Sequence, residues 1–559
     1  MEAFLTKVLW LWSLTVAQPE AASARVEQLV QTMSVEQKVG QLMMIGIPGR
    51  TLDQTTGKLL RDLHVGAVAL FGFNIKSNVQ LVRLIGDIRK NLSDDVQPFI
   101  ALDQEGGNVV RVRSEVAVLP GAMVLGATRD PVLAFLAGQA NGVDLRLLGV
   151  DMNLAPVLDI NRNPKNPVIN VRAIGDYPQL VSSLGLAYIQ GQQQAEMATV
   201  AKHFPGHGTT AKDSHFSLPT LHLTEEELWA SEIPPFLDAV QNGLDAIMMA
   251  HVQVPALEPS GLPASLSPKI ITGLLRGKMG FDGVVITDDM EMRAIEASRD
   301  VGKVAVLAIQ AGADMVMTIW TAQKKQRIQR SLLQAVQSGA ISAERLDESV
   351  RRILRLKEKR GSLDSLSRPQ PNLSQYLPNP YHEQLIRAIA LRGITLVRNE
   401  GNAIPICQGK KVLVATPVGV FLKELKALLP EATFLPITLV PNQKTRDAEL
   451  ARIRELGRRY RLVVVAVVNA YQAWMVQQLA HWLKTPLVVV SLGSPYYLRN
   501  FPNVSGYVCA YSSQPSVQRA AAQALGGQTS ISGRLPISVN DRYPRGHGLI
   551  LSGASCLKE

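Results

Sequence analysis

The sequence predicts an α/β protein in which a (β/α)8 barrel of the TIM type is followed by a smaller α/β domain. Three observations carry this prediction. Short apolar segments alternate with longer segments of helical periodicity over the first 360 residues. A stretch rich in Pro, Ser and Asn then interrupts the pattern, and the alternation resumes behind it. A chain of 559 residues is also too long for one ordinary hydrophobic core, so two or three domains are expected.

Eight candidate strands precede the interruption. They are VGQLMMIGI from residue 39, GAVALFGF from 66, PFIAL from 98, VDMNLAPVLDI from 150, ATVAKHF from 198, DAIMMAHV from 245, GVVITDD from 283 and ADMVMT from 313. Nearly continuous apolar strands are typical of a parallel sheet that is buried on both faces. Helical periodicity between them, as in 225–242 and 267–279, completes the βα units. Ser267 and Pro268 are suited to the N-cap and first position of the second of these helices.

The breaks in composition suggest four segments. These are an N-terminal segment (1–24), the barrel (25–360), a linker (361–385) and a C-terminal domain (386–559). In the last segment KKVLVATP, RLVVVAVV, PLVVVSLG and GYVCAYS are strand candidates, and residues 471–483 have helical periodicity. They predict a smaller, open parallel sheet. Because the sequence has neither a Walker loop nor a GxGxxG segment, it does not signal a nucleotide site.

Charge and composition narrow the function classes. A net charge of +11 and a pI near 9.5 permit attraction to nucleic acid, anionic membranes or anionic wall polymers, with solubility alone as the plain alternative. The basic run RRILRLKEKR (351–360) has the spacing of an amphipathic helix with Ile353, Leu354 and Leu356 inward and its cations in solvent. Because no aromatic residues are interleaved with it, we expect no nucleic-acid partner. Three widely spaced cysteines predict neither a disulfide framework nor a zinc ribbon.

The N-terminus leaves two cellular locations open. MEAFLTKVLWLWSLTVAQ carries one lysine, then an apolar run from Val8 to Val16 and a small-x-small site at residues 15–17, as an export signal does. The run is short and Glu2 lies before it, so a cytoplasmic protein whose N-terminal helix caps the domain is the preferred interpretation; a periplasmic or extracellular protein is the alternative. No later apolar run reaches the roughly 20 residues that span a bilayer, so we expect no stable membrane insertion.

Polar residues follow at least five of the eight predicted strands. In chain order they are Asp103, Glu105, Asp159, Arg172, Lys202, His203, His251, Asp288 and Asp289. Functional residues of such barrels lie at the carboxyl ends of the strands, and a buried charge is costly without a partner. A shared polar site is therefore expected, although each residue taken singly could also be a strand end that reaches solvent.

The segment KHFPGHGTTAKDSH (202–215) allows three interpretations. His203, His207, Asp213 and His215 could bind a metal ion, the segment could be a plain surface loop, or Asp213 and His215 could transfer protons. Proline and glycine between the first two histidines exclude a regular helix that would place both on one face, and the adjacent lysine would repel a dication. Residues two apart lie on the same side of an extended segment, and a histidine titrates near neutrality. The proton-transfer dyad is therefore preferred.

The segment VVITDDMEM (284–292) supplies a carboxylate to face that dyad. Strand alternation places Asp288 and Asp289 on opposite sides, so only one of them points to the barrel axis, and the spacing does not say which. The other is expected to cap the following helix. A carboxylate opposite a histidine acid/base suits a two-step displacement at a sugar carbon.

At these residues the sequence resembles a known family. KHFPGHGTTAKDSH, ALDQEGGNVVR and ITDDMEM resemble signature segments of family 3 glycoside hydrolases, in the bacterial β-N-acetylhexosaminidase (β-N-acetylglucosaminidase) branch that acts on peptidoglycan fragments. RGITLVRNEGNAIPI and GGQTSISGRLPISV resemble the second, α/β sandwich domain of its two-domain members. The resemblance implies Asp288 as nucleophile and His215 as acid/base with Asp213 as its partner. It also implies a set of sugar-binding residues, namely Asp103, Arg111, Arg172, Lys202 and His203.

The resemblance implies a retaining exo-glycosidase that removes terminal N-acetylglucosamine in cell-wall recycling, with no cofactor and no metal. Phosphorolysis on the same scaffold, a metal-dependent barrel hydrolase and a non-catalytic amino-sugar-binding protein are the alternatives. Ile174 stands where the family carries an aromatic residue, and Thr287 stands where it carries serine. Because Lys202 and His203 are sequential, both reach one pocket only if the strand ends or bulges there. The partner expected is a carbohydrate substrate, and the oligomeric state stays open.

Overall fold

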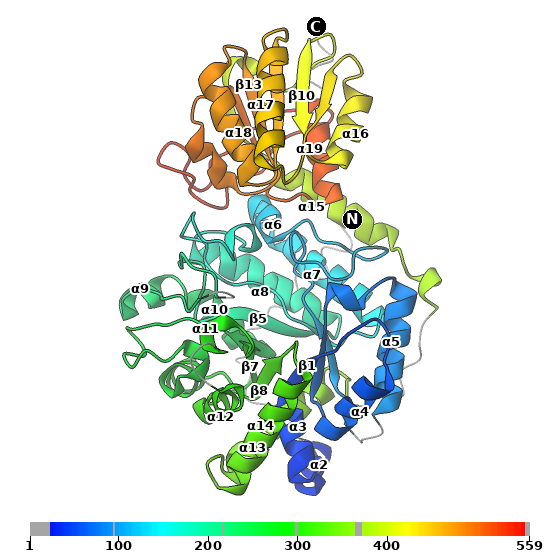
Figure 1. Ribbon diagram of the computed structural model, residues 1–559, viewed down its shortest axis with the longest axis vertical. Coiled ribbons are helices and arrows are strands. Elements are labelled where there is room, and N and C mark those ends of the chain that lie inside the picture. The colour runs from blue at the N-terminus through cyan, green and yellow to red at the C-terminus, as the bar shows by residue number, and fades with distance from the viewer. Residues whose placement is uncertain (1–22, 93–95, 215–216, 297–299, 364–371, 554–559) are drawn as a thin grey trace.

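The computed structural model describes residues 23–92, 96–214, 217–296, 300–363 and 372–553. It consists of a large barrel domain and a smaller domain stacked on it along the long axis of the molecule (Figure 1). Residues 1–22 of the expected N-terminal segment (1–24) and the expected acid/base His215 lie outside the described residues. In the described part of the chain, no helix is long and apolar enough to span a membrane.

Eight parallel strands close into a barrel, as the sequence predicts, and neighbours along the chain are neighbours in the barrel. The strands are β1 (Met43–Gly46), β2 (Ala67–Leu70), β3 (Phe99–Leu102), β4 (Met152–Asn153), β5 (Ala198–Phe204), β6 (Ala246–Met249), β7 (Val284–Asp289) and β8 (Met315–Thr318). Nearly all of their residues are buried, which is why they appear in the sequence as apolar runs.

Helices surround this barrel (Figure 1). They include α2 (Ala24–Thr32), α3 (Val35–Gln41), α4 (Gln54–Leu63), α5 (Asn78–Asn91), α6 (Ala122–Thr128), α7 (Pro131–Leu147), α8 (Pro178–Gln194), α9 (Glu225–Ala230), α10 (Pro234–Gln241), α11 (Arg293–Glu296), α12 (Val301–Ala311), α13 (Ala322–Gln337) and α14 (Ala343–Lys359). The single helix expected over 225–242 is in fact two, because Pro234 lacks a backbone N–H and begins α10. The segment Lys269–Lys278 is a π-helix, and the Ser267 hydroxyl caps it by accepting the Ile270 N–H.

The smaller domain contains a six-stranded sheet in the order β11–β10–β12–β13–β14–β9. The four predicted strands are present as β10 (Val412–Thr416), β12 (Leu462–Val467), β13 (Leu487–Ser491) and β14 (Gly506–Cys509). Two further strands, β9 (Thr395–Asn399) and β11 (Thr433–Pro436), form its edges. The expectation of a purely parallel sheet is wrong, because β9 pairs antiparallel with β14.

Five helices accompany this sheet: α15 (Pro380–Gly393), α16 (Gly419–Leu428), α17 (Gln443–Gly457), α18 (Ala470–Trp482) and α19 (Pro515–Leu525). Helix α15 begins within the range expected as linker and lies between the two domains, where it packs on α6 and on α19. Cys509 is a free, buried thiol.

The basic run 351–360 corrects the sequence interpretation. Ile353, Leu354 and Leu356 are buried as predicted, but several of the cations are not in solvent. Arg360 pairs with buried Asp245 at 2.7 Å, and Arg352 lies 3.4 Å from buried Asp314. These carboxylates lie at the N-terminal ends of barrel strands, and a buried charge requires a partner. The run therefore neutralises the end of the barrel opposite the expected site.

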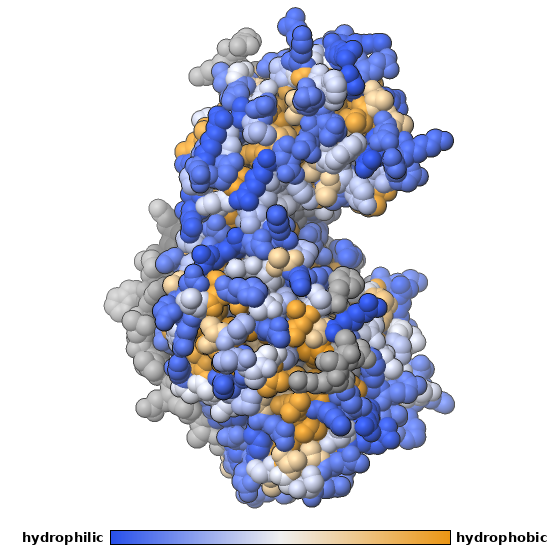
Figure 2. All heavy atoms as spheres, turned by 60° about the vertical axis from the view of Figure 1, so that its left-hand side comes forward, coloured by the Kyte–Doolittle hydropathy of each residue, from blue (hydrophilic) through white to orange (hydrophobic). Residues whose placement is uncertain are grey.

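Both domains contribute to a network of contacts where they meet. The Gln514 side-chain amide donates to the Gly107 carbonyl at 2.5 Å, in the loop after β3. Arg534 donates its backbone N–H to the carbonyl of Ala127 at 3.0 Å. The space-filling view shows a hollow between the two domains and a mostly hydrophilic surface on the smaller one (Figure 2). The second domain thus touches a loop that carries expected site residues.

Candidate active site

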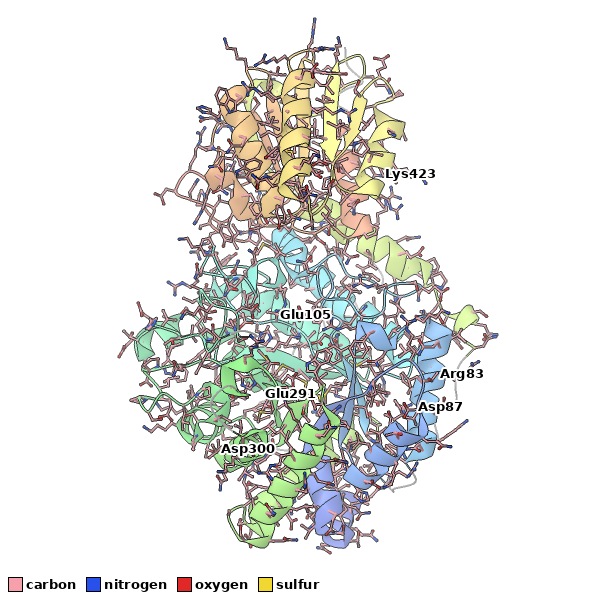
Figure 3. All side chains as sticks on the ribbon, viewed as in Figure 1. Arg83, Asp87, Glu105, Glu291, Asp300 and Lys423 are labelled. Atoms are coloured by element: carbon pink, nitrogen blue, oxygen red, sulfur yellow. The ribbon has the colours of Figure 1, made fainter. Side chains whose placement is uncertain are left out.

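A cluster of charged side chains lies at the carboxyl end of the barrel. Lys202 at the end of β5 places its ammonium group 2.8 Å from Asp103 and 2.7 Å from Glu105, both of which follow β3. Arg111 binds the other oxygen of Asp103 at 2.9 Å, and Arg172 binds Glu105 through two hydrogen bonds of 2.9 and 2.8 Å. Glu105 points into the barrel from the half nearest the smaller domain, whereas Arg83 and Asp87 lie outside on α5 (Figure 3).

The charges of this cluster nearly balance. Three cations face two carboxylates, which leaves one positive charge in excess. Burial alone would raise the pKa of Glu105, but Arg172 and Lys202 hold it well below its ordinary value. Burial would lower the pKa of Lys202, yet Asp103 and Glu105 raise it above its ordinary value. Glu105 and Lys202 therefore keep their charges at neutral pH, and the cluster presents donors and acceptors suited to sugar hydroxyls.

Strand β5 bulges at the position where two sequential residues must both reach the site. Its register against β6 shifts between Lys202 and Phe204. As a result the side chain of Lys202 reaches Asp103. The Nδ1 atom of His203 lies 2.7 Å from an oxygen of Asp159, in the segment that follows β4. The bulge that the sequence requires is confirmed.

Asp159 also anchors the loop that carries the expected dyad. Its carboxylate accepts the backbone N–H of His207 at 2.7 Å. The His207 ring then contacts the Ser214 hydroxyl at 3.0 Å through Nε2 and the Thr210 hydroxyl at 2.9 Å through Nδ1. Ser214 is flanked by Asp213 and by the expected acid/base. The loop is thus tied to the strand end on which His203 lies.

The two aspartates of β7 face different surroundings. Asp288 is half-buried. Burial lowers the pKa of both His207 and His251, and the carboxylate of Asp288 opposes this shift. Strand β7 pairs with β6, so Asp288 lies at the barrel end where His251 follows β6. Asp289 instead accepts the Glu291 N–H at 3.1 Å ahead of α11, and burial raises its pKa to about 7. Asp289 therefore caps the turn after β7, which precedes the start of α11 at Arg293, whereas the sequence led us to expect a cap on the helix itself.

Glu232, which lies just before α10, was not identified from the sequence. It is fully buried, and one of its oxygens accepts the Thr209 hydroxyl at 2.5 Å. Its other oxygen has no hydrogen-bond partner among the described residues and faces Gly206, where an added Cβ would approach to 2.5 Å. Burial raises the pKa of Glu232 to about 8. No local pattern marks this residue, because only folding brings it under the 202–214 loop.

Aromatic rings form part of the barrel mouth. Phe71 and Phe73 follow β2 and stack with centroids 5.8 Å apart, and both contact Trp320, which follows β8. The Arg111 guanidinium lies 5.1 Å from the centroid of the Phe71 ring. Trp320 is 62% exposed, so its ring is accessible beside the charged cluster.

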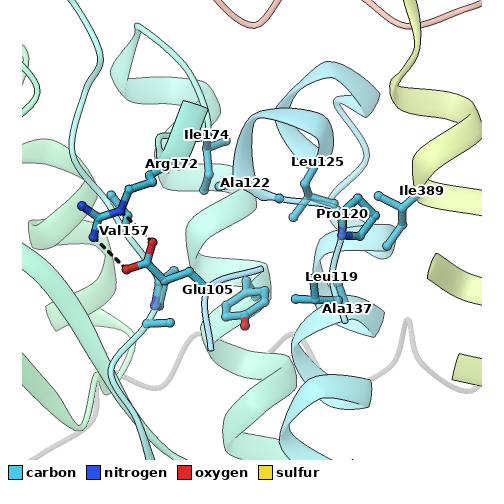
Figure 4. A pocket seen from close by; sticks show the side chains of 14 residues that line it. Glu105, Leu119, Pro120, Ala122, Leu125, Ala137, Val157, Arg172, Ile174 and Ile389 are labelled. Carbon is cyan, nitrogen blue, oxygen red and sulfur yellow. Dashed lines mark hydrogen bonds and ion pairs between the residues drawn. The ribbon is translucent and has the colours of Figure 1, made fainter. Parts of the chain in front are cut away.

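An apolar cavity lies behind the Glu105–Arg172 pair (Figure 4). It has a volume of about 30 Å³ and is lined mainly by side chains from α6, α7 and the segments around them, with Ile389 from α15. Ile174, which departs from the family pattern, is part of this lining. An apolar wall on one side reduces screening and so strengthens the ion pair that holds Arg172 in place.

Two of the histidines that could have bound a metal, His203 and His207, already have partners. Both ring nitrogens of His207 contact hydroxyl groups, and Nδ1 of His203 contacts Asp159. Across the described ranges no group of three or more His, Cys, Asp or Glu side chains has an arrangement that could hold a metal ion.

A closed (β/α)8 barrel with a charged cluster and a histidine loop at its carboxyl end defines an enzyme of the barrel class. Residues 34–356 match the family model described as glycosyl hydrolase family 3 N terminal domain. The chain therefore belongs to glycosyl hydrolase family 3, and its class is that of a glycoside hydrolase.

Individual relatives extend this match. The chain is 32% identical over 387 residues to beta-hexosaminidase A of Pseudoalteromonas piscicida, an alignment that covers 65% of this chain and 64% of that protein. It thus spans less than two thirds of that relative's length. The solved structure of a family 3 beta-N-acetylglucosaminidase from Paenibacillus sp. str. FPU-7 is 39% identical, with a TM-score of 0.86 over 91% of this chain and 99% of that one. A beta-glucoside phosphorylase shares the fold, with a TM-score of 0.80 at 22% identity over 94% of this chain and 99% of that one.

Proposed function

We propose that the protein is a retaining exo-β-N-acetylhexosaminidase that removes terminal N-acetylglucosamine, with peptidoglycan fragments as its substrates. The observation that carries the proposal is the position of Asp288. It lies at the carboxyl end of β7, the end of the closed parallel barrel at which the charged cluster and the loop leading to Asp213 also lie, and that loop is held by the contact between His207 and Ser214. The names of the relatives at 32% and 39% identity support the amino-sugar preference.

In the proposed mechanism Asp288 attacks the anomeric carbon while His215 protonates the leaving oxygen. The bond to the aglycone breaks, and a covalent glycosyl-enzyme forms with inversion. His215, now neutral, takes a proton from water, which attacks the same carbon with a second inversion and releases the sugar with its configuration retained. Asp213 orients the imidazole and stabilises its charged form.

The charged cluster binds the sugar in this proposal. Asp103 accepts hydrogen bonds from hydroxyl groups, while Arg111, Arg172 and Lys202 donate to hydroxyl oxygens and to the N-acetyl carbonyl. His203, which is fixed by Asp159, adds a further contact. Because these groups are already held by one another, little conformational entropy is lost when the sugar binds.

Phosphorolysis is the second candidate. The excess positive charge of the cluster and a histidine in place of a carboxylate acid/base favour the approach of a phosphate dianion as the second nucleophile. In that case the product is a sugar 1-phosphate in place of the free sugar.

The test compares an aryl β-N-acetylglucosaminide with the matching β-glucoside, with and without EDTA and in phosphate or a neutral buffer. We expect turnover of the N-acetyl substrate only, unaffected by EDTA. Asp288→Asn should lower kcat by at least about a thousandfold, whereas Asp289→Asn, a matched control one residue away, should keep most of the activity. Equal activity of the two variants would overturn the assignment of the nucleophile, and release of sugar 1-phosphate would establish phosphorolysis.

A further inference from the structure

A second pocket lies where the barrel meets the smaller domain. Its volume is about 280 Å³, far larger than the cavity behind Arg172. It contains none of the residues of the charged cluster. Both domains line it, with Arg162, Pro164 and Asp176 from the barrel and Tyr496, Arg499, Ser538 and Arg545 from the smaller domain.

The charges in this pocket do not balance. Three arginines face one carboxylate, which leaves two positive charges in excess. Arg545 approaches Asp176 only to 3.7 Å, a distance too long for a hydrogen bond. Arg162, Arg499 and Arg545 are all exposed to solvent, so their guanidinium groups are accessible to a ligand.

The walls of the pocket are fixed by contacts between the domains. The Tyr496 hydroxyl donates to the carbonyl of Asn161 at 3.1 Å, directly beside Arg162. One oxygen of Asp176 accepts the backbone N–H of Ser538 at 2.8 Å. The Arg499 guanidinium lies 5.1 Å from the Tyr496 ring centroid and also donates to the carbonyl of Val539. Two of the three arginines are therefore held by rings or carbonyls before any ligand arrives, since Arg545 lies 5.0 Å from the ring of Tyr177.

Asp176 provides an independent indication of a missing partner. Its second oxygen is buried and has no hydrogen-bond partner among the described residues. Burial raises the pKa of this carboxyl group above its ordinary value despite the arginines around it. The three guanidinium groups of the pocket supply more hydrogen-bond donors than this one carboxyl group can accept.

We propose that this pocket binds an oxyanion, a carboxylate or a phosphate group, between the two domains. Planar guanidinium groups match both anions through paired hydrogen bonds. Two sources share this chemistry: an acidic group on the aglycone of a bound substrate, and free phosphate as an effector. The second source does not depend on the proposed function.

The pocket is connected to the site through the segment after β4. Asn163, next to Arg162, donates to the carbonyl of Thr210 at 3.0 Å and of Thr209 at 3.3 Å. Both carbonyls belong to the loop that leads to Asp213. An anion that fixes Arg162 therefore also restrains the segment that supports this loop.

The first experiment measures binding without turnover. Inorganic phosphate and, separately, D-lactate are titrated against the full-length protein by calorimetry and thermal unfolding, with NaCl at matched ionic strength as the screen for non-specific charge effects. We expect saturable binding that raises Tm with ligand concentration. The variant R162Q/R499Q/R545Q should bind at least about tenfold more weakly, whereas Arg83→Gln, which removes an exposed guanidinium on the outer face of α5, should bind like the wild type. Arg162→Gln alone tests the same pocket if the triple variant does not fold.

The second experiment separates the two sources. It compares kcat/KM for a neutral aryl N-acetylglucosaminide and for one whose aglycone carries a carboxylate. A loss confined to the acidic substrate in the arginine variants identifies the aglycone as the ligand. A phosphate-dependent rate on the neutral substrate identifies an effector if it is lost in the arginine variants and the product is free sugar and not sugar 1-phosphate. Absence of saturable binding, or equal binding by wild type and the triple variant, would overturn the pocket proposal while leaving the proposed function intact. Absence of turnover with phosphate binding retained would overturn the proposed function and leave the pocket proposal intact.

Discussion

Replacing Glu232 with glutamine tests whether a neutral carboxyl group supports the histidine loop. The residue is fully buried beneath that loop, and burial raises its pKa from 4.5 to about 8. The unfolded chain releases this proton near its ordinary pKa, whereas the folded chain retains it up to about pH 8. Between these values the folded state binds more protons than the unfolded state, so the contribution of Glu232 to stability falls as pH rises.

The magnitude follows from the two pKa values. At about 1.36 kcal/mol per pH unit, ionising Glu232 in place costs roughly 5 kcal/mol above pH 8, and almost nothing below pH 4.5. Glutamine has nearly the same shape and never ionises. The variant Glu232→Gln should therefore gain stability over the wild type steadily from pH 5 to pH 8. For a barrel of this size the gain corresponds to a Tm difference on the order of 5 °C.

Thermal unfolding at intervals of one pH unit from 4.5 to 8.5 measures this difference, because all other titrating groups cancel between wild type and variant. Glu226→Gln removes an exposed carboxylate from neighbouring α9 and serves as the control; its difference from the wild type should not change with pH. Parallel curves for wild type and Glu232→Gln would show that Glu232 is ionised in the folded protein at neutral pH.

Three further outcomes are expected. Lys202→Met leaves Asp103 and Glu105 with one partner each, and kcat/KM for the N-acetyl substrate should fall by at least about a hundredfold in steady-state assays. Asp314→Asn leaves buried arginines without their carboxylate at the opposite end of the barrel, so urea unfolding should show a loss of roughly 3–5 kcal/mol with kcat per folded molecule unchanged. Trp320→Ala removes an exposed ring at the barrel mouth, and KM for aryl glycosides should rise several-fold, by roughly 1 kcal/mol, with kcat nearly constant.

The eight barrel strands are predictable because each is buried on both faces and is therefore apolar throughout. The second domain is only partly predictable by the same rule. Its central strands β12 and β13 are buried at every residue, but β11 is an edge strand with exposed ends and terminates in a proline. Strand β9 ends in the polar residues Arg398 and Asn399, and an apolar run carries no information on its direction. The antiparallel pairing of β9 with β14 could not be deduced from local pattern.

The end of the barrel opposite the site contains buried carboxylates whose contacts are not visible in the sequence. Asp151, Asp245 and Asp314 each lie one residue before an even-numbered strand. Each accepts a backbone N–H from the preceding odd-numbered strand, at 2.9, 3.2 and 2.9 Å respectively. The spacing between them is irregular in the sequence, so no repeat is visible there. The arginine partners of Asp245 and Asp314 are distant in the sequence, which is why the basic run 351–360 looks like a solvated face until the chain folds.

In the candidate site, too, some features are predictable from the local sequence and others depend on contacts between distant segments. Positions at strand ends are local, and the sequence identifies Asp103, Lys202 and Asp288 by that rule. Partnerships are not local: Glu105 binds both Arg172 and Lys202 because β3, β5 and the loop after β4 converge in the closed barrel.

The charged cluster and the histidine loop are stabilised by two different segments of the barrel domain, and both segments contact the smaller domain. The charged cluster depends on the loop after β3, whose Gly107 carbonyl accepts a hydrogen bond from Gln514. The histidine loop depends on the segment after β4, whose Asn161 carbonyl accepts one from the Tyr496 hydroxyl. A relative movement of the smaller domain would therefore act on the charged cluster and on the 202–214 loop together. The second domain thus helps to position the site, although none of its side chains belongs to the charged cluster. The proposed oxyanion pocket lies at the interface between the two domains, where such a movement would occur.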